Sequence, residues 1–339
     1  MLPNSFIKSI SYYLPETVFT NDDFYKEFPE AKANQESLSK IGVKQRHIAG
    51  KEELASDMAV KSAQKLFTEH NMDPGSIDFL LFCAQEFDYF TPTTACTIQH
   101  RLNLPLSCGA LDFNLGCSGF VYGLSMAKGL IESVGLKNVL LLTSSSLTRK
   151  LHPKDRSSRY LFGDGACATL IGSGSAESSI DQFVFGTDGK NAEKIMVKDG
   201  GARYPITSQS FEEIKDDYGN ITAAAYIDMK GMPVFSFSTK IVPSIISEVL
   251  HKHGKQINDV DLFIFHQANL FIIETVRKKM NLDEARVFNY MENVGNTVSS
   301  SIPIALYEAI KCGRAKKGDC ILLAGFGVGL SWAATLIKL

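Results

Sequence analysis

Short apolar runs alternate along the chain with stretches in which apolar residues recur at helical spacing. Runs of this kind, bounded by polar or glycine residues, predict buried strands. They occupy residues 79–82, 139–142, 262–265 and 321–323. Because strands and helices alternate, the pattern predicts an α/β fold. The polar, glycine-containing stretch 188–220 is expected to cover the surface as a link or lid between two halves.

The chain also contains a weak internal repeat. The hexapeptide at residues 77–82 resembles that at residues 260–265, and each begins a similar series of elements. A Phe-Asn pair and a glycine precede Cys117 in the first series and Asn296 in the second. The repeat predicts two similar halves, residues 1–175 and 176–339, with Cys117 and Asn296 at matching helix starts that face one another across a central site. Chance similarity between two α/β halves is the alternative.

The charges are nearly balanced, with 35 lysines and arginines against 37 aspartates and glutamates. This balance provides no field for non-specific nucleic-acid binding. No apolar stretch is long enough to cross a bilayer and residues 1–10 lack a signal-peptide pattern, so a soluble, cytoplasmic protein without a membrane partner is expected. The seven cysteines include no C-x-x-C pair, which argues against a disulfide framework and a zinc site. No metal is expected.

Cys117 stands in the tetrapeptide Gly116-Cys117-Ser118-Gly119, between an apolar run and the amphipathic stretch 122–133. This arrangement predicts a strand-to-helix turn, in which the positive end of the helix dipole would stabilise a thiolate nucleophile. Gly116 and Gly119 would leave room for a substrate carbonyl to approach the sulfur. A buried structural cysteine beside a turn is the alternative.

Two further residues carry candidate chemistry. His266 follows the strand at residues 262–265, and ligands bind where strands of an α/β sheet end. A hydrogen-bonded core histidine is the alternative. Asn296 precedes the helix predicted over residues 302–310, where its carboxamide could donate to a substrate or simply cap the helix.

Three glycines, Gly325, Gly327 and Gly329, alternate with larger residues near the end of the chain and are expected to follow a buried strand. The pattern exposes backbone N–H groups that could stabilise an oxyanion. Dinucleotide binding is a poor alternative, because only about ten residues remain for the helix that such a motif opens. A glycine-rich hairpin that only packs is the other alternative.

In combination, these motifs resemble the β-ketoacyl-acyl-carrier-protein synthase III family of the thiolase superfamily. The resemblance covers essentially the whole chain. Its motifs are Thr91-Pro92-Thr93-Thr94-Ala95-Cys96, Gly116-Cys117-Ser118-Gly119, Phe162-Gly163-Asp164-Gly165-Ala166, Met229-Lys230-Gly231, His266-Gln267-Ala268-Asn269-Leu270, Gly295-Asn296-Thr297 and Gly325-Phe326-Gly327-Val328-Gly329. It implies a five-layered αβαβα fold built from two similar halves, the first carrying the cysteine and the second carrying the histidine, the asparagine and the glycine-rich loop.

The resemblance implies decarboxylative condensation of an acyl group with a malonyl thioester, without a cofactor. Cys117 would accept the acyl group from acyl-CoA. His266 and Asn296 would act on malonyl-acyl-carrier-protein, and the N–H groups of Cys117 and Val328 would form the oxyanion hole. A thiolase would carry a second catalytic cysteine in the C-terminal glycine loop, which this chain lacks, and synthases that elongate longer chains use two histidines.

The resemblance also implies substrate-binding residues, namely Lys40, Arg156, Leu161, Gly231, Phe235, Ala268 and Asn269, and an acyl pocket formed by Thr91 and Phe162. The chain departs from the family pattern where Lys40, Glu36 and Phe271 replace an arginine, a tryptophan and an arginine. These departures put the acyl donor and the carrier protein in doubt. Thr91 replaces a phenylalanine of acetyl-selective relatives, which predicts a longer or branched acyl primer.

A homodimer is expected from the resemblance, with the buried strand near residues 140–144 as its seam. Two rival functions keep the same fold. The first transfers the acyl group from Cys117 to an alcohol or amine, and release of carbon dioxide from a malonyl thioester would exclude it. The second is a non-catalytic docking subunit, which would need neither a reactive thiol nor the hydrogen-bond donors.

Overall fold

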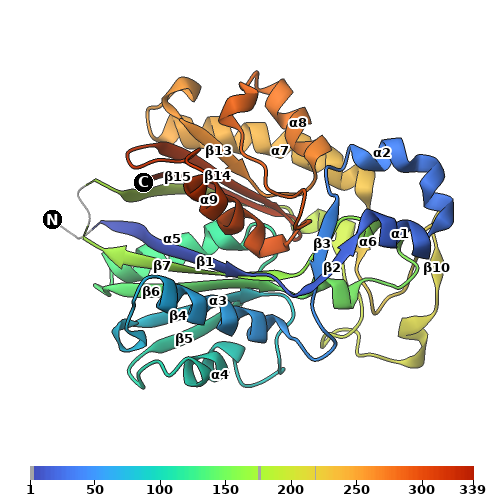
Figure 1. The fold of residues 1–339 in the computed structure, drawn as a ribbon, viewed down its shortest axis with the longest axis horizontal. Helices are drawn as coiled ribbons and strands as arrows, with labels where there is room; N and C mark the ends of the chain where they lie inside the picture. The colour runs from blue at the N-terminus through green and yellow to red at the C-terminus, as the bar shows by residue number, and fades with distance from the viewer. Residues whose placement is uncertain (1–3, 175–176, 218) are drawn as a thin grey trace.

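Two β-sheets form the centre of the computed structural model, which describes residues 4–174, 177–217 and 219–339 (Figure 1). The first sheet has the strand order β1-β7-β6-β4-β5 and the second has the order β13-β14-β15-β8. The strands of the first sheet are β1 (Ser5–Tyr13), β4 (Phe79–Ala84), β5 (Gly109–Asn114), β6 (Asn138–Ser145) and β7 (Gly165–Ser173). Those of the second are β8 (Ser179–Thr187), β13 (Leu262–Phe265), β14 (Cys320–Gly327) and β15 (Ser331–Lys338).

The second sheet repeats the connections of the first. β4 pairs with β6 in parallel, as β13 does with β14. β7 then joins antiparallel to β6 and to β1, as β15 does to β14 and to β8. The second sheet has no strand that corresponds to β5 among the described residues. At that position it has only an isolated parallel bridge between Phe263 and Val287. The repeated topology agrees with the internal repeat, and the predicted boundary between residues 175 and 176 lies outside the described residues.

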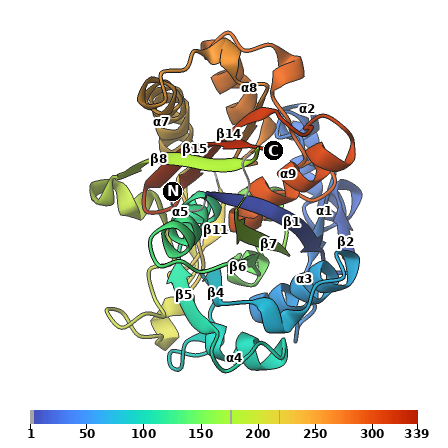
Figure 2. The same ribbon diagram turned by 90° about the vertical axis from the view of Figure 1, so that its left-hand side faces the viewer.

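The helices form three layers around the two sheets, which gives the five-layered αβαβα arrangement of a thiolase-like fold (Figures 1 and 2). Two helices lie between the sheets and contact strands of both: α5 (Gly119–Glu132) and α9 (Ser301–Lys311). The outer face of the first sheet is covered by α3 (Ala55–Glu69) and α4 (Thr94–Arg101). That of the second is covered by α7 (Gly231–Lys252) and α8 (Leu270–Lys279).

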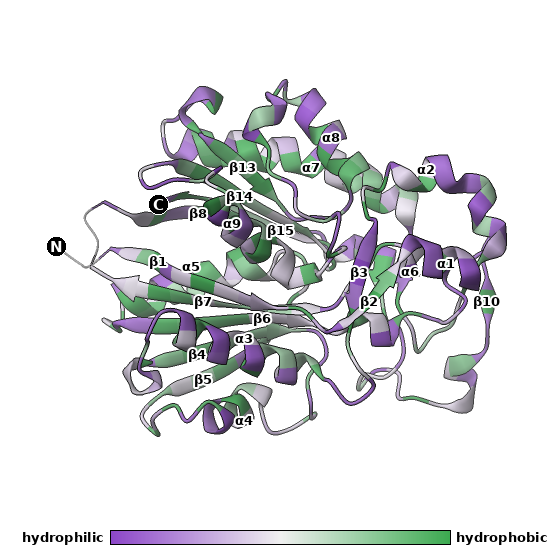
Figure 3. Ribbon diagram, viewed as in Figure 1, coloured by the Kyte–Doolittle hydropathy of each residue, from purple (hydrophilic) through white to green (hydrophobic). Residues whose placement is uncertain are grey.

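Hydropathy follows these layers (Figure 3). The strands of both sheets are apolar because helices cover both faces, whereas the outer helices are apolar only on the side that packs on a sheet. In α3, for example, Met58, Leu66 and Phe67 are buried while Lys61 is exposed. The middle helices have no face directed at water along most of their length, since each is enclosed by two sheets.

Shorter elements gather at one end of the two sheets (Figure 1). They are β2 (Thr17–Thr20), α1 (Asn21–Glu27), α2 (Gln35–Ser39), β3 (Gln45–Ile48), α6 (Arg156–Arg159), β9 (Ile195–Met196), β10 (Ile214–Lys215), β11 (Ile221–Thr222) and β12 (Asp228–Met229). The 3₁₀-helical segments are η1 (Pro29–Asn34), η2 (Pro74–Ser76), η3 (Leu147–Lys150), η4 (Gly189–Lys194), η5 (Ser208–Phe211), η6 (Ile257–Asp259), η7 (Glu284–Arg286) and η8 (Val298–Ser300). As predicted, the described part of the stretch 188–220 lies mostly on the surface.

The predicted strands lie within β4, β6, β13 and β14, so the α/β prediction is confirmed. One boundary was wrong: β14 continues through Gly327, so Gly325 and Gly327 lie inside a strand of a β14–β15 hairpin and do not follow it. Glycine is uncommon within strands, which is why the pattern predicted an earlier end. No helix in the described part of the chain is long and apolar enough to cross a membrane.

The predicted dimer seam is also wrong. Leu140, Leu142 and Ser144 are buried, and β6 is paired along both edges, with β4 and with β7. It therefore has no edge or face left for a second copy of the chain. The two edge strands of the first sheet are β1 and β5.

Candidate active site

One pocket brings together the three candidate catalytic residues, Cys117, His266 and Asn296. It encloses about 950 Å³, its open mouth included. Besides these three, its wall consists of Gln85, Leu147, Leu161, Phe162, Ile195, Ile227, Met229, Gly231, Met232, Val234, Phe235, Ser238, Ala268, Asn269, Phe271, Ile272, Val298, Phe326, Gly327 and Val328. A mostly apolar pocket with a few convergent polar groups is typical of a small-molecule site.

Cys117 lies between β5 and α5, where the β14–β15 hairpin passes directly over it. A Cβ on Gly327 would stand 2.7 Å from the Cys117 Sγ and 2.8 Å from its Cβ, so no side chain fits there. The Ser118 and Ser331 hydroxyls form a 2.7 Å hydrogen bond that ties the start of α5 to the hairpin. The glycines of the hairpin therefore let its backbone approach the sulfur.

Burial and the start of the helix act in opposite directions on the ionisation of the Cys117 thiol. Burial raises its pKa to about 12, although hydrogen bonds from the backbone N–H groups of Val328 and of Cys117 itself lower it. The helix dipole is thus outweighed by the loss of water around the sulfur. The same two N–H groups point at the sulfur, which is the attacking atom. Their predicted role as an oxyanion hole, for which they would have to donate to the substrate oxygen, stays a prediction.

The roles predicted for Gly116 and Gly119 also differ from what is observed. A Cβ on Gly119 would run into the Cys83 Sγ, on the side of the core. A Cβ on Gly116 would stand 2.5 Å from Val328 Cγ1 and 2.8 Å from Gln85 Oε1. Both glycines therefore permit close packing around Cys117 and do not clear a path for substrate.

His266 directly follows β13, as predicted, and its ring is buried. Its Nδ1 lies 2.7 Å from the Ser301 hydroxyl, and its Nε2 lies 3.5 Å from the Asn296 Nδ2. Burial lowers the pKa of His266 to about 3, so the imidazole is neutral near pH 7. Because Nδ1 is engaged by Ser301, Nε2 is the nitrogen directed at Asn296 and the pocket. The alternative of an uninvolved core histidine is not supported by this position.

Asn296 is fixed by its main chain and by its carboxamide. Its N–H donates to Leu161 O at 3.0 Å, and its C=O accepts from Gly163 N at 3.1 Å. Its Oδ1 accepts from Val298 N at 2.9 Å, so its Nδ2 points towards Ala268 O, at 3.3 Å, and His266. The helix-cap alternative is wrong, because the cap of α9 is Ser300.

Val298 holds this orientation at a conformational cost. Its φ is +52°, a left-handed value, and the other three non-glycine residues with positive φ in the described part of the chain are asparagines. For a β-branched residue this conformation is an outlier that costs roughly 1–3 kcal/mol. It directs the Val298 N–H onto the Asn296 Oδ1 and thereby sets which end of the carboxamide faces the pocket.

Most of the predicted substrate-binding residues line the pocket: Leu161, Phe162, Gly231, Phe235, Ala268 and Asn269. Three do not. Lys40 is an exposed residue at the C-terminal cap of α2, and Arg156 forms an ion pair with Glu30 at 3.4 Å. Thr91 is exposed in the loop between β4 and α4. Roles for these three in binding substrate stay predictions.

The pocket mouth is apolar. Met232 is 71% exposed and Phe271 53% exposed, and the Phe271 ring stacks on Phe235 with a centroid distance of 5.1 Å. Phe271 is the residue that replaces an arginine of the family pattern, so this side of the mouth offers apolar surface where that pattern has a positive charge.

Sequence analysis did not identify several pocket residues. Gln85 directly follows β4 in the way that His266 follows β13, so the strand-end signal was available. Leu147, Ile195 and Ile227 carried no such signal, because apolar residues in loops and short elements look alike whether they line a cavity or pack in a core.

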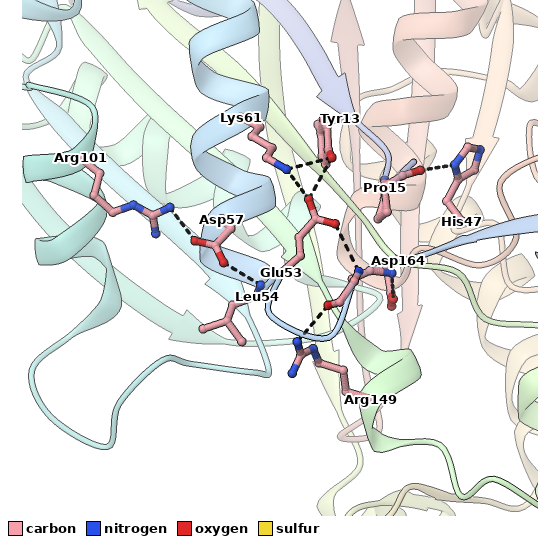
Figure 4. Close-up of polar contacts among 12 residues, drawn as sticks. Tyr13, Pro15, His47, Glu53, Leu54, Asp57, Lys61, Arg101, Arg149 and Asp164 are labelled. Carbon is pink, nitrogen blue, oxygen red and sulfur yellow. Dashed lines mark hydrogen bonds and ion pairs between the residues drawn. The ribbon is translucent and has the colours of Figure 1, made fainter. Parts of the chain in front are cut away.

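A second, wider groove beside α3 is polar, and its charged groups largely satisfy one another (Figure 4). Glu53 accepts hydrogen bonds from Lys61 at 2.5 Å and from Tyr13 at 2.9 Å. Arg101 pairs with Asp57 at 2.6 Å. These contacts fasten the start of α3 to β1 and α4. In the ranges that the structure describes, no group of three or more His, Cys, Asp or Glu side chains is placed to hold a metal ion.

Two carboxyl groups lie close to the site in largely apolar surroundings. The pKa of Glu86 is raised to about 7, chiefly by burial and also by the charge of Asp164, against the hydrogen bond from Ser146 N and the charge of Lys150, which lower it. Burial likewise raises the pKa of Asp164 to about 6, against hydrogen bonds from Thr148 and Ala49 that lower it. The folded protein is therefore more stable when these two carboxyl groups are protonated than when they are charged.

We expect Glu86→Gln to stabilise the protein at pH 8 and to leave its stability unchanged at pH 5. Between pH 4.5 and 7 the folded state keeps a proton on Glu86 that the unfolded chain releases. The stabilisation is therefore complete below about pH 4.5, falls as the pH rises, and is lost once the pH has passed about 7. The loss amounts to at most about 3 kcal/mol. Thermal unfolding should show a Tm gain of several degrees at pH 8.

The control is Glu36→Gln on the exposed helix α2, which should not change the Tm at either pH. An equal shift for Glu86→Gln at pH 5 and pH 8 would show that the carboxyl has an ordinary pKa.

Two family models match the chain. The model of 3-oxoacyl-[acyl-carrier-protein (ACP)] synthase III matches residues 111–189, and the model of the C-terminal part of these enzymes matches residues 250–339. The first range contains Cys117 and the second contains His266, Asn296 and Val328, so the matches include all three candidate catalytic residues.

Similar proteins carry the same description. The β-ketoacyl-[acyl-carrier-protein] synthase III of Caldanaerobacter subterraneus subsp. tengcongensis is 35% identical over 326 residues, which are 96% of this chain and 95% of that protein. A crystal structure of a 3-oxoacyl-(acyl-carrier-protein) synthase III is 43% identical over 99% of this chain and 100% of that chain, with a TM-score of 0.97. A 3-oxoacyl-(acyl-carrier protein) synthase from Burkholderia xenovorans LB400 is 32% identical over 100% of this chain and 95% of that chain, with a TM-score of 0.91. Identity at this level along nearly the whole length shows that the protein belongs to the β-ketoacyl-acyl-carrier-protein synthase III family.

Proposed function

We propose that the protein condenses an acyl group, carried on Cys117, with malonyl-acyl-carrier-protein and releases carbon dioxide and a 3-oxoacyl thioester. The observation that carries this proposal is the meeting of Cys117, His266 and Asn296 in one apolar pocket, with two backbone N–H groups directed at the sulfur. The names of the relatives supply the carrier protein as partner. Acyl-CoA is the proposed donor of the acyl group.

In the first half-reaction, the Cys117 sulfur attacks the carbonyl of the acyl thioester. A bond forms between Sγ and the acyl carbon, the bond from that carbon to the CoA sulfur breaks, and CoA leaves as a thiol with the proton from Cys117. Since the thiol is neutral at rest, its proton must be removed as the attack proceeds. The neutral His266 Nε2 is the proposed acceptor that relays this proton. The N–H groups of Cys117 and Val328 stabilise the oxyanion.

In the second half-reaction, the malonyl thioester carbonyl binds between His266 and Asn296. The bond to the carboxylate carbon breaks, carbon dioxide leaves, and the electron pair becomes an enolate whose oxygen accepts hydrogen bonds from Nε2–H and Nδ2–H. The enolate carbon then attacks the acyl group and displaces the Cys117 sulfur, which leaves as a thiolate and takes up a proton from solvent to restore the neutral thiol. Ser301 supports both steps, because its hydroxyl can accept from Nδ1 or donate to it, so that either tautomer of His266 keeps a partner.

This chemistry needs no cofactor, because nucleophile, proton acceptor and hydrogen-bond donors are all side chains or backbone groups of the chain. Leu147, Ile195 and Ile227 line the pocket and are buried, so they provide an apolar surface suited to an acyl chain. In the proposed division of the chain, the nucleophile would belong to the half at residues 1–175 and the donors to the half at residues 176–339.

The test combines intact-protein mass spectrometry with product analysis. Incubation with acyl-CoA should add one acyl mass to the protein, and a malonyl thioester should then remove it with release of carbon dioxide. Acylation without carbon dioxide release, followed by transfer to an alcohol or amine, would support the rival acyltransferase. A protein that gains no mass with any acyl-CoA would be a docking subunit.

We further propose a homodimer that forms along the free edge of β5. An unpaired, exposed edge strand is a common route to association. Exposed apolar side chains surround it: Phe90 is 93% exposed, Leu106 99%, and Tyr89 and Leu111 are exposed as well. A second copy on this surface would also cover Thr91, which follows Phe90. In such a dimer Thr91 could contribute to the acyl pocket, as predicted.

Phe90→Asp is expected to convert this dimer into monomers, because a charge would replace a large apolar side chain in the proposed contact. Analytical ultracentrifugation would measure the shift in mass. The matched control is Val134→Asp, which places the same charge on an exposed apolar residue beyond the C-terminal end of α5. If the Phe90→Asp variant remains a dimer, the interface lies on another surface of the protein.

A further inference from the structure

The pocket wall contains few side chains able to bind a polar group of a substrate, and nearly all have partners. Ser238 Oγ donates to Val234 O at 2.8 Å, on its own helix. Asn269 Oδ1 caps α8 by accepting from Ile272 N at 2.8 Å. His266 and Asn296 are held by Ser301, Val298 and Ala268, as described above, and Cys117 is the nucleophile. Among the polar side chains of this wall, Gln85 alone makes no hydrogen bond to any residue that the structure describes.

Gln85 has no hydrogen-bond partner within the part of the chain that the structure describes, although its carboxamide carries two donors and an acceptor. It extends from the end of β4 against Gly116, where a Cβ would stand 2.8 Å from Gln85 Oε1. Val328 Cγ1 approaches the same point to 2.5 Å. The amide is therefore next to Cys117 and Val328, at the sulfur end of the pocket.

This position selects which part of a substrate meets Gln85. Gly116 directly precedes Cys117, and consecutive Cα atoms are about 3.8 Å apart. An amide packed on Gly116 therefore lies close enough to an acyl group on Cys117 to reach atoms two or three bonds from its carbonyl carbon. Gln85 is only partly buried, so water can pair with its amide while the pocket is empty. An unsubstituted acyl chain displaces this water and leaves the amide unpaired, which costs roughly 1–3 kcal/mol. A substrate with a hydrogen-bonding substituent in this region avoids that cost.

We propose that Gln85 is a specificity-determining residue that selects acyl groups with a hydrogen-bonding substituent close to the thioester, such as 3-hydroxyacyl groups. The inference rests on the proposed function, since it needs acylation of Cys117. Gln85 contacts the substituent and takes no part in bond making, so it acts on the choice of acyl group and not on the chemistry of transfer.

The experiment compares matched acyl-CoA pairs: octanoyl with 3-hydroxyoctanoyl, and butanoyl with 3-hydroxybutanoyl. The second-order rate constant of acylation is followed by intact-protein mass spectrometry. The unmodified protein should favour the hydroxylated member of each pair by about tenfold, the value of one net hydrogen bond. Gln85→Met has similar volume without donors or acceptors and should abolish or reverse this preference. Gln64→Met, the same change on the exposed face of α3, should preserve it.

The outcomes separate the inference from the function on which it rests. Equal rates for both members of a pair in the unmodified protein would overturn the inference, and this result needs no variant. An equal loss for both members in Gln85→Met would also overturn it, because a bond to the CoA arm or general packing would then explain the amide. Failure of every acyl-CoA to acylate the protein would refute the proposed function itself.

Discussion

Asn296→Ala is expected to lower decarboxylation of a malonyl thioester by about 10²–10³-fold while acylation of Cys117 proceeds at its normal rate. The carboxamide Nδ2 donates to the enolate oxygen, a charge that exists only in the second half-reaction. Its orientation is preset by the Val298 N–H, so no reorganisation is required when the charge develops. Alanine removes the donor and leaves the sulfur, its N–H partners and His266 in place.

The two half-reactions can be measured separately. Acyl-enzyme formation is followed by the mass gain, and decarboxylation by release of labelled carbon dioxide. Asn269→Ala serves as a matched change, because it removes a neighbouring carboxamide whose oxygen caps α8. It should reduce stability without this split between the half-reactions. An equal loss of both half-reactions in Asn296→Ala would contradict the role assigned to Asn296.

Cys117→Ala should produce the opposite result, with no acyl-enzyme at all and with decarboxylation retained. The alanine has no nucleophilic atom, so mass spectrometry should detect no added acyl group even after long incubation with excess acyl-CoA. The donors to the malonyl carbonyl, His266 and Asn296, do not depend on the sulfur. Carbon dioxide should therefore still be released, within about tenfold of the normal rate, while no condensed product forms.

The control for this variant is Cys83→Ala, which removes the buried thiol directly behind α5 but not the nucleophile. It should lower stability through the lost packing and still acquire one acyl group. Acylation of Cys117→Ala at any residue would show that Cys117 is not the acceptor.

The sequence was sufficient to predict the fold and the meeting of the candidate catalytic residues, because both follow from local patterns. The parallel strands of each sheet have their carboxyl ends on the same side. Side chains that directly follow β13 or directly precede α5 therefore lie near one another. The repeat correctly related β4 to β13. It could not show that the counterpart of β5 is reduced to the single bridge at Phe263 and Val287, since a strand is defined by its partners.

The errors concern properties that arise only from packing. The position of Cys117 before a helix predicted a thiolate, but the pKa of the thiol depends on how much water the rest of the fold excludes. Gly116 and Gly119 were predicted to leave room for substrate. The space beside them is instead filled by Val328 and Cys83, which come from distant parts of the chain. Gln85 was missed because an unpaired amide is recognised only when every possible partner has been located.

The middle layer of the fold acts as a spacer that aligns two separately anchored groups. The nucleophile stands at the start of α5, and the two donors are anchored on the second sheet and next to α9, so helix thickness sets the gap between them. Ala127 and Ala305 are fully buried in this layer. Larger residues there would separate the sheets, and since a misplacement of about 1 Å can cost about 100-fold in rate, turnover would fall although no substrate-contacting residue had changed.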